Sequence, residues 1–336
     1  MVLATLAVPA MVMATPPPPN ILFLMCDSMD GRVIDPTSPV SKMVATPNLD
    51  QLATTGVNFI RTYAASPQCV PSRTSMLAGR RTDQIRAFSN GNGLAGDPSG
   101  KLDKMCLKVY DREVCESWAT TQRVNSTFFD ALAPVYAPGA PPEGDNCTLC
   151  IMGKVDVGQN ILSRYGPSPK ADGWHNGPGL SILTRSADIR RPTKPNPRTI
   201  TNDKDDNVHP EDWKMHSECI DWLAKGAGRR LASASSPWFL YCSLNIPHPP
   251  FQTNGTWLKS VDQQAVRANP PRWINTSSLH PHDAYMTISK AVDGQFSDEA
   301  IFLVRRTYYA MVAETDFLMG QVLDALRGSG MYDDTL

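Results

Sequence analysis

Two short, uninterrupted apolar runs constrain the fold more than any other feature of the chain. Residues 20–26 (Asn-Ile-Leu-Phe-Leu-Met-Cys) follow a proline cluster, and residues 238–244 form a second run of the same kind. Apolar runs of this length predict strands that are buried on both faces, as in a parallel sheet. Amphipathic helical patterns lie between and after them. Strands that alternate with helices predict the α/β class, a mostly parallel sheet covered by helices on both faces.

Caps, prolines and glycines mark the helices that we expect between these strands. Thr46 followed by Pro47 predicts a helix start, and Gly56 predicts the end of that helix. Residues 57–64 then predict a further strand. Residues 211–225 have apolar side chains at helical spacing and predict a second helix.

The composition is that of a globular protein, and it weighs against two classes of partner. The chain has 336 residues, with 32 Lys and Arg against 33 Asp and Glu, so its net charge is −1. This balance gives no support for nucleic-acid binding or for a basic membrane-binding surface. No apolar run approaches the roughly 18 residues of a membrane-spanning helix. The 29 prolines predict many loops and few very long helices.

Residues 1–19 are expected to form a leader and a proline-rich spacer. The first fourteen are apolar and uncharged and end in a small-residue cleavage pattern, and four prolines follow. This pattern is typical of the second half of a secretory signal, without its basic start; a disordered tail is the alternative. Residues 20–336 would then form the folded domain, with polar insertions near 88–120 and 165–210.

Glycosylation and disulfide motifs agree with an exported protein. Four Asn-x-Ser/Thr triplets, each weak by itself, begin at Asn125, Asn146, Asn254 and Asn275. The chain has eight cysteines, and in an oxidising compartment two closely spaced pairs are disulfide candidates. These pairs are Cys106 with Cys115 in a polar insertion, and Cys147 with Cys150 in a Pro/Gly-rich loop. Half of a zinc site at the second pair is the alternative, but no other pair has matching spacing.

The run from Cys69 to Arg80 carries the chemistry. It reads Cys-Val-Pro-Ser-Arg-Thr-Ser-Met-Leu-Ala-Gly-Arg, and Pro71 predicts the start of a helix that continues to about Ala78. The run resembles the signature of the sulfatase family, in which formylglycine-generating enzyme oxidises the cysteine to formylglycine. The resemblance implies an alkaline-phosphatase-like α/β/α sandwich. A buried structural cysteine before a capped helix is the alternative.

Further blocks extend this resemblance over nearly the whole chain apart from the insertions. Residues similar to sulfatases in order and spacing are 46–53, 56–59, 63–66, 245–249 and 308–316. Within the family the chain is most similar to the enzymes that remove the 2-sulfate from glucuronate. The residues that carry this closer similarity are 27–32, 153–156, 280–281 and 310–316. The implied substrate is therefore a sulfated carbohydrate, in particular 2-sulfated glucuronate in glycosaminoglycans.

The nucleophile implied by the resemblance is the formylglycine made from Cys69. A sulfate monoester is a stable anion, so its hydrolysis needs charge neutralisation and a nucleophile held in line. One hydroxyl of the hydrated aldehyde attacks sulfur; after the alcohol leaves, the other hydroxyl collapses to the aldehyde and expels sulfate. The positive end of the helix near Pro71 suits this anion, and Arg73 is expected to hold the formylglycine and its charge. Pro71 and Arg73 also resemble the elements that the modifying enzyme recognises on an unfolded chain.

Asp27 is the expected protein ligand of a divalent cation. It ends the first predicted strand, at the carboxyl edge where α/β sheets place their ligands. The resemblance implies Ca²⁺, or alternatively Mg²⁺, bound by Asp27 and by the oxygens made from Cys69. Most sulfatases have two adjacent aspartates here, whereas this chain has Asp27-Ser28. Ser28 or Asp30 could supply a further oxygen, and a strand-end cap is the alternative role for Asp27.

Lys154 and His248 are expected to act on the sulfate group. Lys154 occupies the family position for a lysine that contacts sulfate as a point charge; a solvated surface lysine is the alternative. His248 lies between two prolines after the second apolar run and would bind sulfate or protonate the leaving alcohol; a loop histidine with local hydrogen bonds is the alternative. Asp156 stands where most sulfatases have a histidine, and His280 and His282 are left without an assigned role.

Part of the expected metal site lies beyond the last residue. We expect Ser297 to cap a long helix that Gly328 and Gly330 end, and residues 333–336 look like the beginning of the next strand. Sulfatases continue there into Asp-His-Gly or Asp-Asn-Gly, which supplies two more metal ligands. We therefore expect the 336-residue chain to be inactive and poorly stable by itself. Sequencing the transcript past the codon for Leu336 tests this expectation.

Three functions stay open on the sequence. The first is the N-terminal part of a lysosomal or secreted sulfatase, in which Arg32, Lys154 and His248 offset the charge of a sulfated uronate. The second is a related hydrolase of phosphate or phosphonate esters, which turnover of an aryl sulfate against an aryl phosphate would separate from the first. The third is a non-catalytic isoform that binds sulfated glycans, which an unmodified Cys69 would favour.

Overall fold

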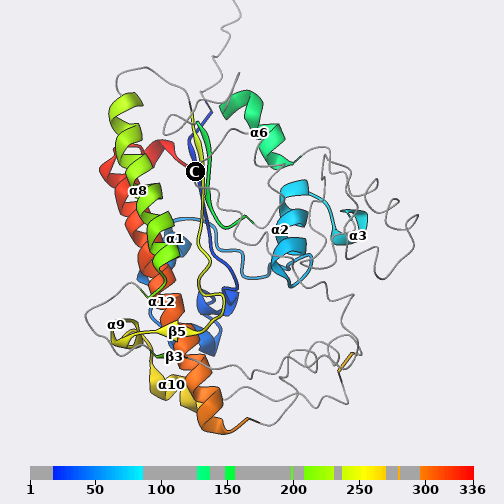
Figure 1. Ribbon diagram of the computed structural model, residues 1–336, viewed down its shortest axis with the longest axis vertical. Helices are drawn as coiled ribbons and strands as arrows, with labels where there is room; N and C mark the ends of the chain where they lie inside the picture. The colour runs from blue at the N-terminus through cyan, green and yellow to red at the C-terminus, as the bar shows by residue number, and fades with distance from the viewer. Residues whose placement is uncertain are drawn as a thin grey trace, which may run out of the picture.

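A computed structural model describes eight segments of the chain. These are residues 18–85, 127–136, 148–155, 198–199, 208–230, 237–269, 279–280 and 296–336. The predicted leader and most of both predicted insertions lie outside the described residues, as do Cys106, Cys115 and Cys147. The fold that positions the site can be followed through the segments that remain (Figure 1).

A parallel sheet forms the centre of the described structure. Strands β1 (Ile21–Met25), β4 (Phe239–Ser243) and β2 (Leu149–Gly153) are hydrogen-bonded in the order β1-β4-β2, and both pairings are parallel. The two strands predicted from apolar runs are thus confirmed. β2 was not predicted, and Cys150, which was expected in a loop, is buried within it. The run Leu149–Met152 is apolar throughout, but it is too short to stand out beside the Gly- and Pro-rich residues before it.

Side chains of these strands alternate between two hydrophobic cores. Phe23, Ile151 and Tyr241 face the helices α2 (Cys69–Ala78) and α6 (Phe128–Tyr136). Leu24, Met152 and Leu240 face the opposite side, where α8 (Pro210–Arg230) and α12 (Asp298–Gly328) pack. Figure 1 shows the two helical layers on either side of the strands. The α/β/α sandwich predicted from the resemblance is therefore present, because each strand has an apolar side chain for each face.

Helix α12 carries a buried carboxylate that fixes the helix α1 (Pro47–Thr55). Asp316 on α12 accepts hydrogen bonds from the backbone N–H groups of Asn48 (3.3 Å) and Leu49 (2.8 Å) and from the Asn48 side chain (2.8 Å). Thr46 stands at the N-cap position, as predicted, but its side chain makes no capping bond. The orphan N–H groups of the first turn are thus satisfied from another helix. Gly320 lets the helices approach, since a Cβ there would lie 2.3 Å from the Asn48 side chain.

The remaining described elements are short, apart from the long helix α12 itself. The predicted cap is confirmed, because the Ser297 hydroxyl accepts from the Ala300 N–H at 3.2 Å. The short elements are η1 (Gly31–Val33), η2 (Pro39–Lys42), α3 (Thr82–Ile85), β3 (Arg198–Thr199), β5 (Gln252–Thr253), α9 (Gly255–Leu258), α10 (Gln263–Ala268) and η7 (Tyr332–Asp334). β3 and β5 form a separate two-stranded parallel sheet beside α12 (Figure 1).

Residues 57–64 do not form the predicted strand. The segment is an irregular loop in which Val57, Phe59 and Tyr63 are 78%, 77% and 89% exposed. A strand needs a neighbour for its backbone groups and a buried face for its apolar side chains. Within the described residues this segment has neither, so β-prone composition alone gave the wrong prediction.

The last residues lie beside the free edge of β1. After η7, Thr335 forms a parallel bridge with Asn20, and the Leu22 N–H donates to the Leu336 carbonyl at 2.8 Å. The Leu336 N–H in turn donates to the Asn20 carbonyl at 2.8 Å. The predicted beginning of a strand therefore lies in parallel register with the sheet, although the described residues there form a bridge and not a strand of full length.

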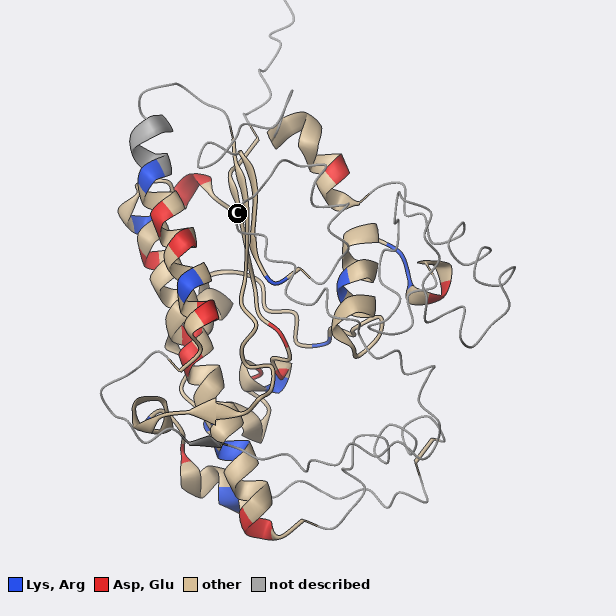
Figure 2. Ribbon diagram, viewed as in Figure 1, with Lys and Arg blue, Asp and Glu red and all other residues tan. Residues whose placement is uncertain are grey.

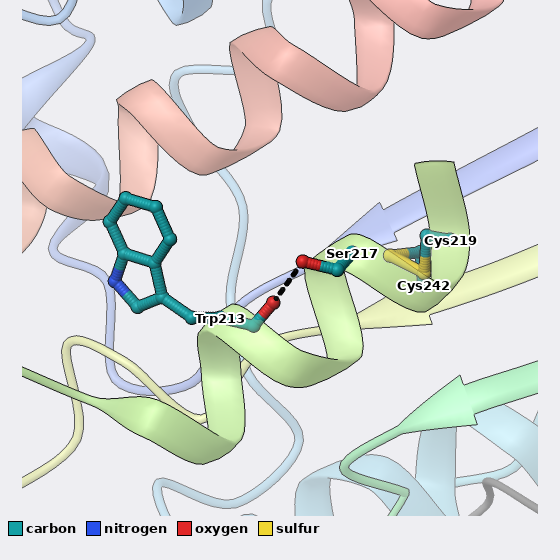
Figure 3. Close-up of a disulfide and its surroundings, with 4 residues drawn as sticks. All are labelled: Trp213, Ser217, Cys219 and Cys242. Atoms are coloured by element: carbon teal, nitrogen blue, oxygen red, sulfur yellow. Dashed lines mark hydrogen bonds between the residues drawn. A yellow bond between two sulfur atoms is a disulfide. The ribbon is translucent and has the colours of Figure 1, made fainter. Parts of the chain in front are cut away.

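A disulfide that the sequence did not indicate joins a helix to the sheet. Cys219 on α8 is bonded to Cys242 on β4, and Figure 3 shows this bond beneath the helix. In the same view Trp213 points away from the disulfide toward α12, where its Nε1 donates to Glu314 at 2.7 Å. Sequence spacing suggested other pairs because these two cysteines are 23 positions apart and lie in two different predicted elements. Cys150 is also disulfide-bonded, which excludes the zinc alternative for it.

The surface of the described residues agrees with the near-zero net charge. Figure 2 shows acidic and basic residues interspersed along the described parts of α8 and α12. Among the described residues, no helix combines the length and the apolar character that crossing a bilayer requires. The charged groups that matter for chemistry are instead buried, at the ends of the strands.

Candidate active site

The register of the sheet brings three loops together. Met25, Ser243 and Gly153 are aligned across the ends of β1, β4 and β2. The residues that follow these strands therefore meet at one edge, the carboxyl edge of a parallel sheet. Asp27, Lys154 and Asn245 come from the three loops, and α2 presents Cys69 and Arg73 to the same place.

Gly153 makes the turn that directs Lys154 into the site. Its φ is +84°, and a Cβ at this position would lie 2.0 Å from the Ser243 carbonyl oxygen. Only glycine adopts this conformation without strain and tolerates so close a backbone approach. The Lys154 N–H then donates to the same Ser243 carbonyl at 3.0 Å, which fixes the chain where it leaves β2.

Asp27 is the centre of the charged cluster. Its Oδ2 lies 2.9 Å from Lys154 Nζ and 3.0 Å from Arg73 Nη2, and all three side chains are buried. Burial alone would raise the pKa of Asp27, but the charges of Lys154 and Arg73 and the hydrogen bonds to the carboxylate outweigh it and hold that pKa well below its usual range. Asp27 is therefore an anion at every physiological pH.

Arg73 ties the helix α2 to the sheet through several acceptors. Its Nη1 donates to the Lys154 carbonyl at 2.6 Å and to the hydroxyls of Tyr241 and Ser243, each at 3.1 Å. Its other terminal nitrogen binds Asp27. The guanidinium therefore orients the Asp27 carboxylate and the Lys154 backbone. Asp27, which it holds, in turn faces position 69.

Cys69 faces this cluster from the first residue of α2. Its Sγ lies 3.6 Å from Asp27 Oδ1 and 3.9 Å from Lys154 Nζ. The helix begins two residues before the predicted start at Pro71, so position 69 lies within the first turn, where unpaired N–H groups favour an anion. Cys69 and Cys26 are the cysteines among the described residues that form no disulfide. Burial raises the pKa of Cys26 to about 12, so it stays a thiol.

His248 completes the group from the loop after β4. A nitrogen of its ring, Asp27 and Cys69 place their ligand atoms within 4.8 Å of one another. The His248 N–H donates to the Asn245 carbonyl at 3.0 Å, and ring Nδ1 donates to the Pro249 carbonyl at 2.6 Å. These bonds fix the turn and the ring. All five residues predicted for the site therefore lie together, while their chemical roles stay predictions.

Asn245 is a member of the site that was not singled out from the sequence. Its Oδ1 accepts a hydrogen bond from Lys154 Nζ at 3.0 Å. The residue belongs to a block that resembles sulfatases, but an asparagine in a loop carries no distinctive signal by itself. Its position directly after β4, on the same edge as Asp27, is the signal that could have indicated it.

The donor set fits part of the coordination shell of a hard cation. Asp27 Oδ1 faces position 69 and accepts from Ser28 Oγ at 2.7 Å, so a carboxylate oxygen and the group at position 69 converge. Asp30 is instead paired with Arg32, with Nη2 2.7 Å from Oδ2. Among the described residues, Asp27 is the carboxylate of this cluster. Ca²⁺ takes six to eight oxygen ligands, so Asp27 and position 69 could hold such an ion only together with other donors. Asp156 lies outside the described residues.

The family assignment follows from this arrangement and from direct comparison. The model of the Sulfatase family matches residues 19–112 and 171–336, which is more than half of the chain. The chain therefore belongs to the sulfatase family, and its fold is the alkaline-phosphatase-like fold.

The relatives make the assignment more specific. Arylsulfatase K of Bos taurus is 27% identical over 338 residues, which cover 97% of this chain and 52% of that protein. Arylsulfatase K of Homo sapiens is 26% identical over 331 residues, which cover 95% of this chain and 52% of that protein. The predicted closer similarity within the family is thus confirmed. The chain spans about half the length of the curated relatives that it matches.

Two solved structures share the fold at lower identity. Phosphonate monoester hydrolase of Agrobacterium radiobacter matches with a TM-score of 0.52 and 21% identity, covering 95% of this chain and 61% of that one. The protein yidJ of Bacteroides fragilis matches with a TM-score of 0.53 and 17% identity, covering 96% and 61%. At these identities the likeness concerns the fold alone.

Proposed function

We propose that this protein is a sulfuric ester hydrolase that removes sulfate from a sulfated sugar. The observation that carries the proposal is the position of Cys69, which lies at the positive end of α2 and faces Asp27 and Lys154 within 4 Å. A sulfate ester placed against position 69 would meet a helix terminus, an ammonium group and an imidazole. This arrangement neutralises an anion while it holds a nucleophile.

Each residue has a role that its contacts support. A formylglycine at position 69 would supply the attacking hydroxyl, and a Ca²⁺ or Mg²⁺ ion at Asp27 would draw charge from the sulfate oxygens. Lys154 binds a sulfate oxygen and is itself held by Asp27 and Asn245. Arg73 keeps Asp27 ionised and oriented. His248 binds the sulfate or protonates the leaving alcohol, since a nitrogen of its ring lies within 4.8 Å of the ligand atoms of Asp27 and Cys69.

The substrate class that we propose is a 2-sulfated glucuronate of glycosaminoglycans. The similarity to arylsulfatase K supports it, and so does the exposed guanidinium of Arg32, whose side chain is 69% exposed beside the loop that carries Asp27. The carboxylate of such a sugar, its second anionic group beside the sulfate, would suit this cation.

We also propose a lysosomal or secreted location, reached through the endoplasmic reticulum. The Cys219–Cys242 disulfide supports an oxidising compartment. The triplets at Asn125, Asn146 and Asn275 lie outside the described residues. Asn254 is buried and caps α9, where its Oδ1 accepts from the Thr256 N–H at 3.0 Å, so in this fold it is not a surface glycan acceptor.

Parallel assays of two esters test the reaction class. The chain is produced in cells that contain formylglycine-generating enzyme, and mass spectrometry measures the mass of the peptide that spans Cys69. We expect formylglycine at position 69 and, in the longest chain that the transcript encodes, turnover of an aryl sulfate well above that of an aryl phosphate. Cys69→Ala should abolish turnover, whereas Cys26→Ala, at the other described free cysteine, should retain it.

Other outcomes would replace the proposal. A strong preference for the aryl phosphate would assign the protein to the phosphate or phosphonate ester hydrolases of the same fold. Unmodified Cys69, with glycan binding but no turnover, would favour a binding protein. The assay should compare the 336-residue chain with the longest chain that its transcript encodes, because activity of the 336-residue chain by itself would contradict the expectation that it is inactive.

A further inference from the structure

A buried carboxylate on α8 holds the loop that follows β4. Asp212 is 5% exposed, and its Oδ1 accepts the backbone N–H of Asn245. The backbone N–H of Ile246 contributes to lowering the pKa of this carboxyl group, against the effect of burial. An N–H group of the loop is thus satisfied by a side chain from the helical layer, as a helix cap would satisfy it.

Asn245 connects this carboxylate to Lys154 and His248, the two residues that we propose to bind sulfate. Its side-chain Oδ1 accepts from Lys154 Nζ at 3.0 Å, and its carbonyl accepts from the His248 N–H at 3.0 Å. Lys154 Nζ in turn lies 2.9 Å from Asp27. A shift of the Asn245 backbone would therefore move the partner of the lysine and the turn that carries the histidine at the same time.

We propose that Asp212 is a positioning residue of the active site, which fixes Asn245 and thereby sets the separation of Lys154 and His248 for an anionic substrate. This inference rests on the proposed function. Asp212 touches neither the sulfate position nor Asp27 in any contact described above, so its effect passes through the backbone of Asn245. Residues that hold the partners of reacting groups commonly change affinity or activity by 10- to 100-fold when they are lost.

The surroundings of Asp212 explain why an uncharged acceptor should replace it. Burial raises the pKa of Asp212 to about 6, against the lowering effect of the Asn245 and Ile246 N–H groups and of His209. Glu314 on α12 and Cys26 after β1 also face it, and neither is a cation. A carbonyl oxygen accepts an N–H in either protonation state of the carboxyl group. The positioning role thus needs the oxygen and not the charge.

Binding of inorganic sulfate to three variants tests this role. Titration calorimetry on the longest chain that the transcript encodes measures the sulfate affinity of wild type, Asp212→Leu and Asp212→Asn. We expect Asp212→Leu, which has no acceptor, to bind sulfate about tenfold more weakly or worse. Asp212→Asn keeps an acceptor oxygen at the same distance along the side chain and should stay within about threefold of wild type.

Asp316 supplies the matched control. It is also a buried carboxylate that accepts hydrogen bonds from the backbone, in its case from two N–H groups at the start of α1. Asp316→Leu should lower the melting temperature and leave the sulfate affinity of the folded molecules within about threefold of wild type. If Asp212→Leu does not fold, Asp212→Ala gives the same comparison, since its smaller side chain also lacks an acceptor and fits in the space that the aspartate leaves.

The outcomes separate the inference from the function on which it rests. Equal sulfate affinity in wild type and in a folded variant without the acceptor would overturn the inference alone. Loss of affinity in Asp212→Asn as large as that in Asp212→Leu would also overturn it, because an acceptor would not have rescued the site. A wild-type chain that binds no sulfate would count against the proposed function, and the inference would fall with it.

Discussion

One carboxylate, Asp27, neutralises two buried cations and still presents an oxygen to position 69. Its Oδ2 faces Lys154 and Arg73, while its Oδ1 faces Ser28 and Cys69. Removing either cation would leave the other to balance the charge, but removing the carboxylate would leave both unpaired. The stability of this part of the molecule therefore depends more on Asp27 than on either basic residue.

Asp27→Asn should lower the free energy of unfolding by about 3–5 kcal/mol, because it leaves buried charges without their partner. Urea unfolding at pH 7 measures this loss. Asp30→Asn is the control, because the Asp30–Arg32 pair is largely exposed and should contribute about 1 kcal/mol or less. Equal effects of the two variants would contradict the central role of Asp27.

The same variant makes a pH-dependent prediction whose sign follows from the lowered pKa. The folded-state pKa of Asp27 lies below the value in the unfolded chain. The stability that Asp27 contributes is therefore fully present above pH ~4 and declines as the pH falls below that value. The difference between wild type and Asp27→Asn should shrink between pH 5 and pH 3; a difference that grows instead would reverse the assigned sign.

Asp212 should show the opposite dependence. Its folded-state pKa is raised from 3.8 to about 6, so the folded state binds the proton more tightly than the unfolded chain does. Wild type should lose stability as the pH rises from ~4 to ~6, by an amount on the order of 3 kcal/mol, whereas Asp212→Asn has no such proton to lose. Thermal unfolding of both chains at pH 4 and pH 7 measures the difference, which should not change with pH if Asp212 is fully solvated.

The residues of the site could be predicted far better than the contacts among them. Cys69, Arg73, Lys154 and His248 were indicated by motifs, and Asp27 by its place at the end of an apolar run. Asn245 and Asp212 were not singled out, because an asparagine and an aspartate with roles through backbone groups have no residue pattern of their own. Such roles arise from the packing of α8 against the strand ends, which the sequence of either segment does not contain.

At the scale of elements, the turn after β2 is the most demanding backbone position near the site. Gly153→Ala should lower the free energy of unfolding by more than about 2 kcal/mol, since the added Cβ meets the Ser243 carbonyl and φ is positive. Gly328→Ala is the control, because a Cβ there meets nothing within 4 Å. We expect the control to change stability by less than about 1 kcal/mol; chemical unfolding of both variants decides.

Elements with a local signal could be predicted, and those that depend on a partner could not. β1, β4, α8 and α12 were expected because their apolar patterns and caps lie within their own residues. The strand expected over residues 57–64 is absent, because pairing is decided by a neighbour and not by β-prone composition. The prediction missed β2 because a run of five residues carries too weak a pattern of its own. These residues form a strand because they pair with β4.

At the scale of the whole molecule, the Cys219–Cys242 disulfide ties the helical layer to the sheet. Replacing both cysteines by alanine should lower the free energy of unfolding by about 3 kcal/mol, as expected for a separation of 23 residues. Melting with and without a reducing agent measures the same bond in wild type. The double variant should be insensitive to the reducing agent; a wild type equally insensitive would show that the two thiols are not joined in solution.

The α/β/α architecture of the whole molecule could be predicted from few residues. Two apolar runs and the helices between them were enough, because buried parallel strands have few alternatives. The order of the strands and the disulfide between the layers could not be predicted, since both depend on which segments meet in three dimensions.

The buried cap of α9 sets an order of events for an exported chain. Asn254 is 0% exposed and accepts a hydrogen bond from the Trp257 N–H at 3.3 Å, so a sugar can be attached only before this turn closes. An attached glycan is bulky and hydrophilic, and it would keep Asn254 at the surface and Trp257 out of the core. Every molecule with this structure is therefore one in which the turn closed before a transferase arrived. The rate at which the four-residue helix α9 folds, and not the presence of the triplet, then decides whether the asparagine is modified.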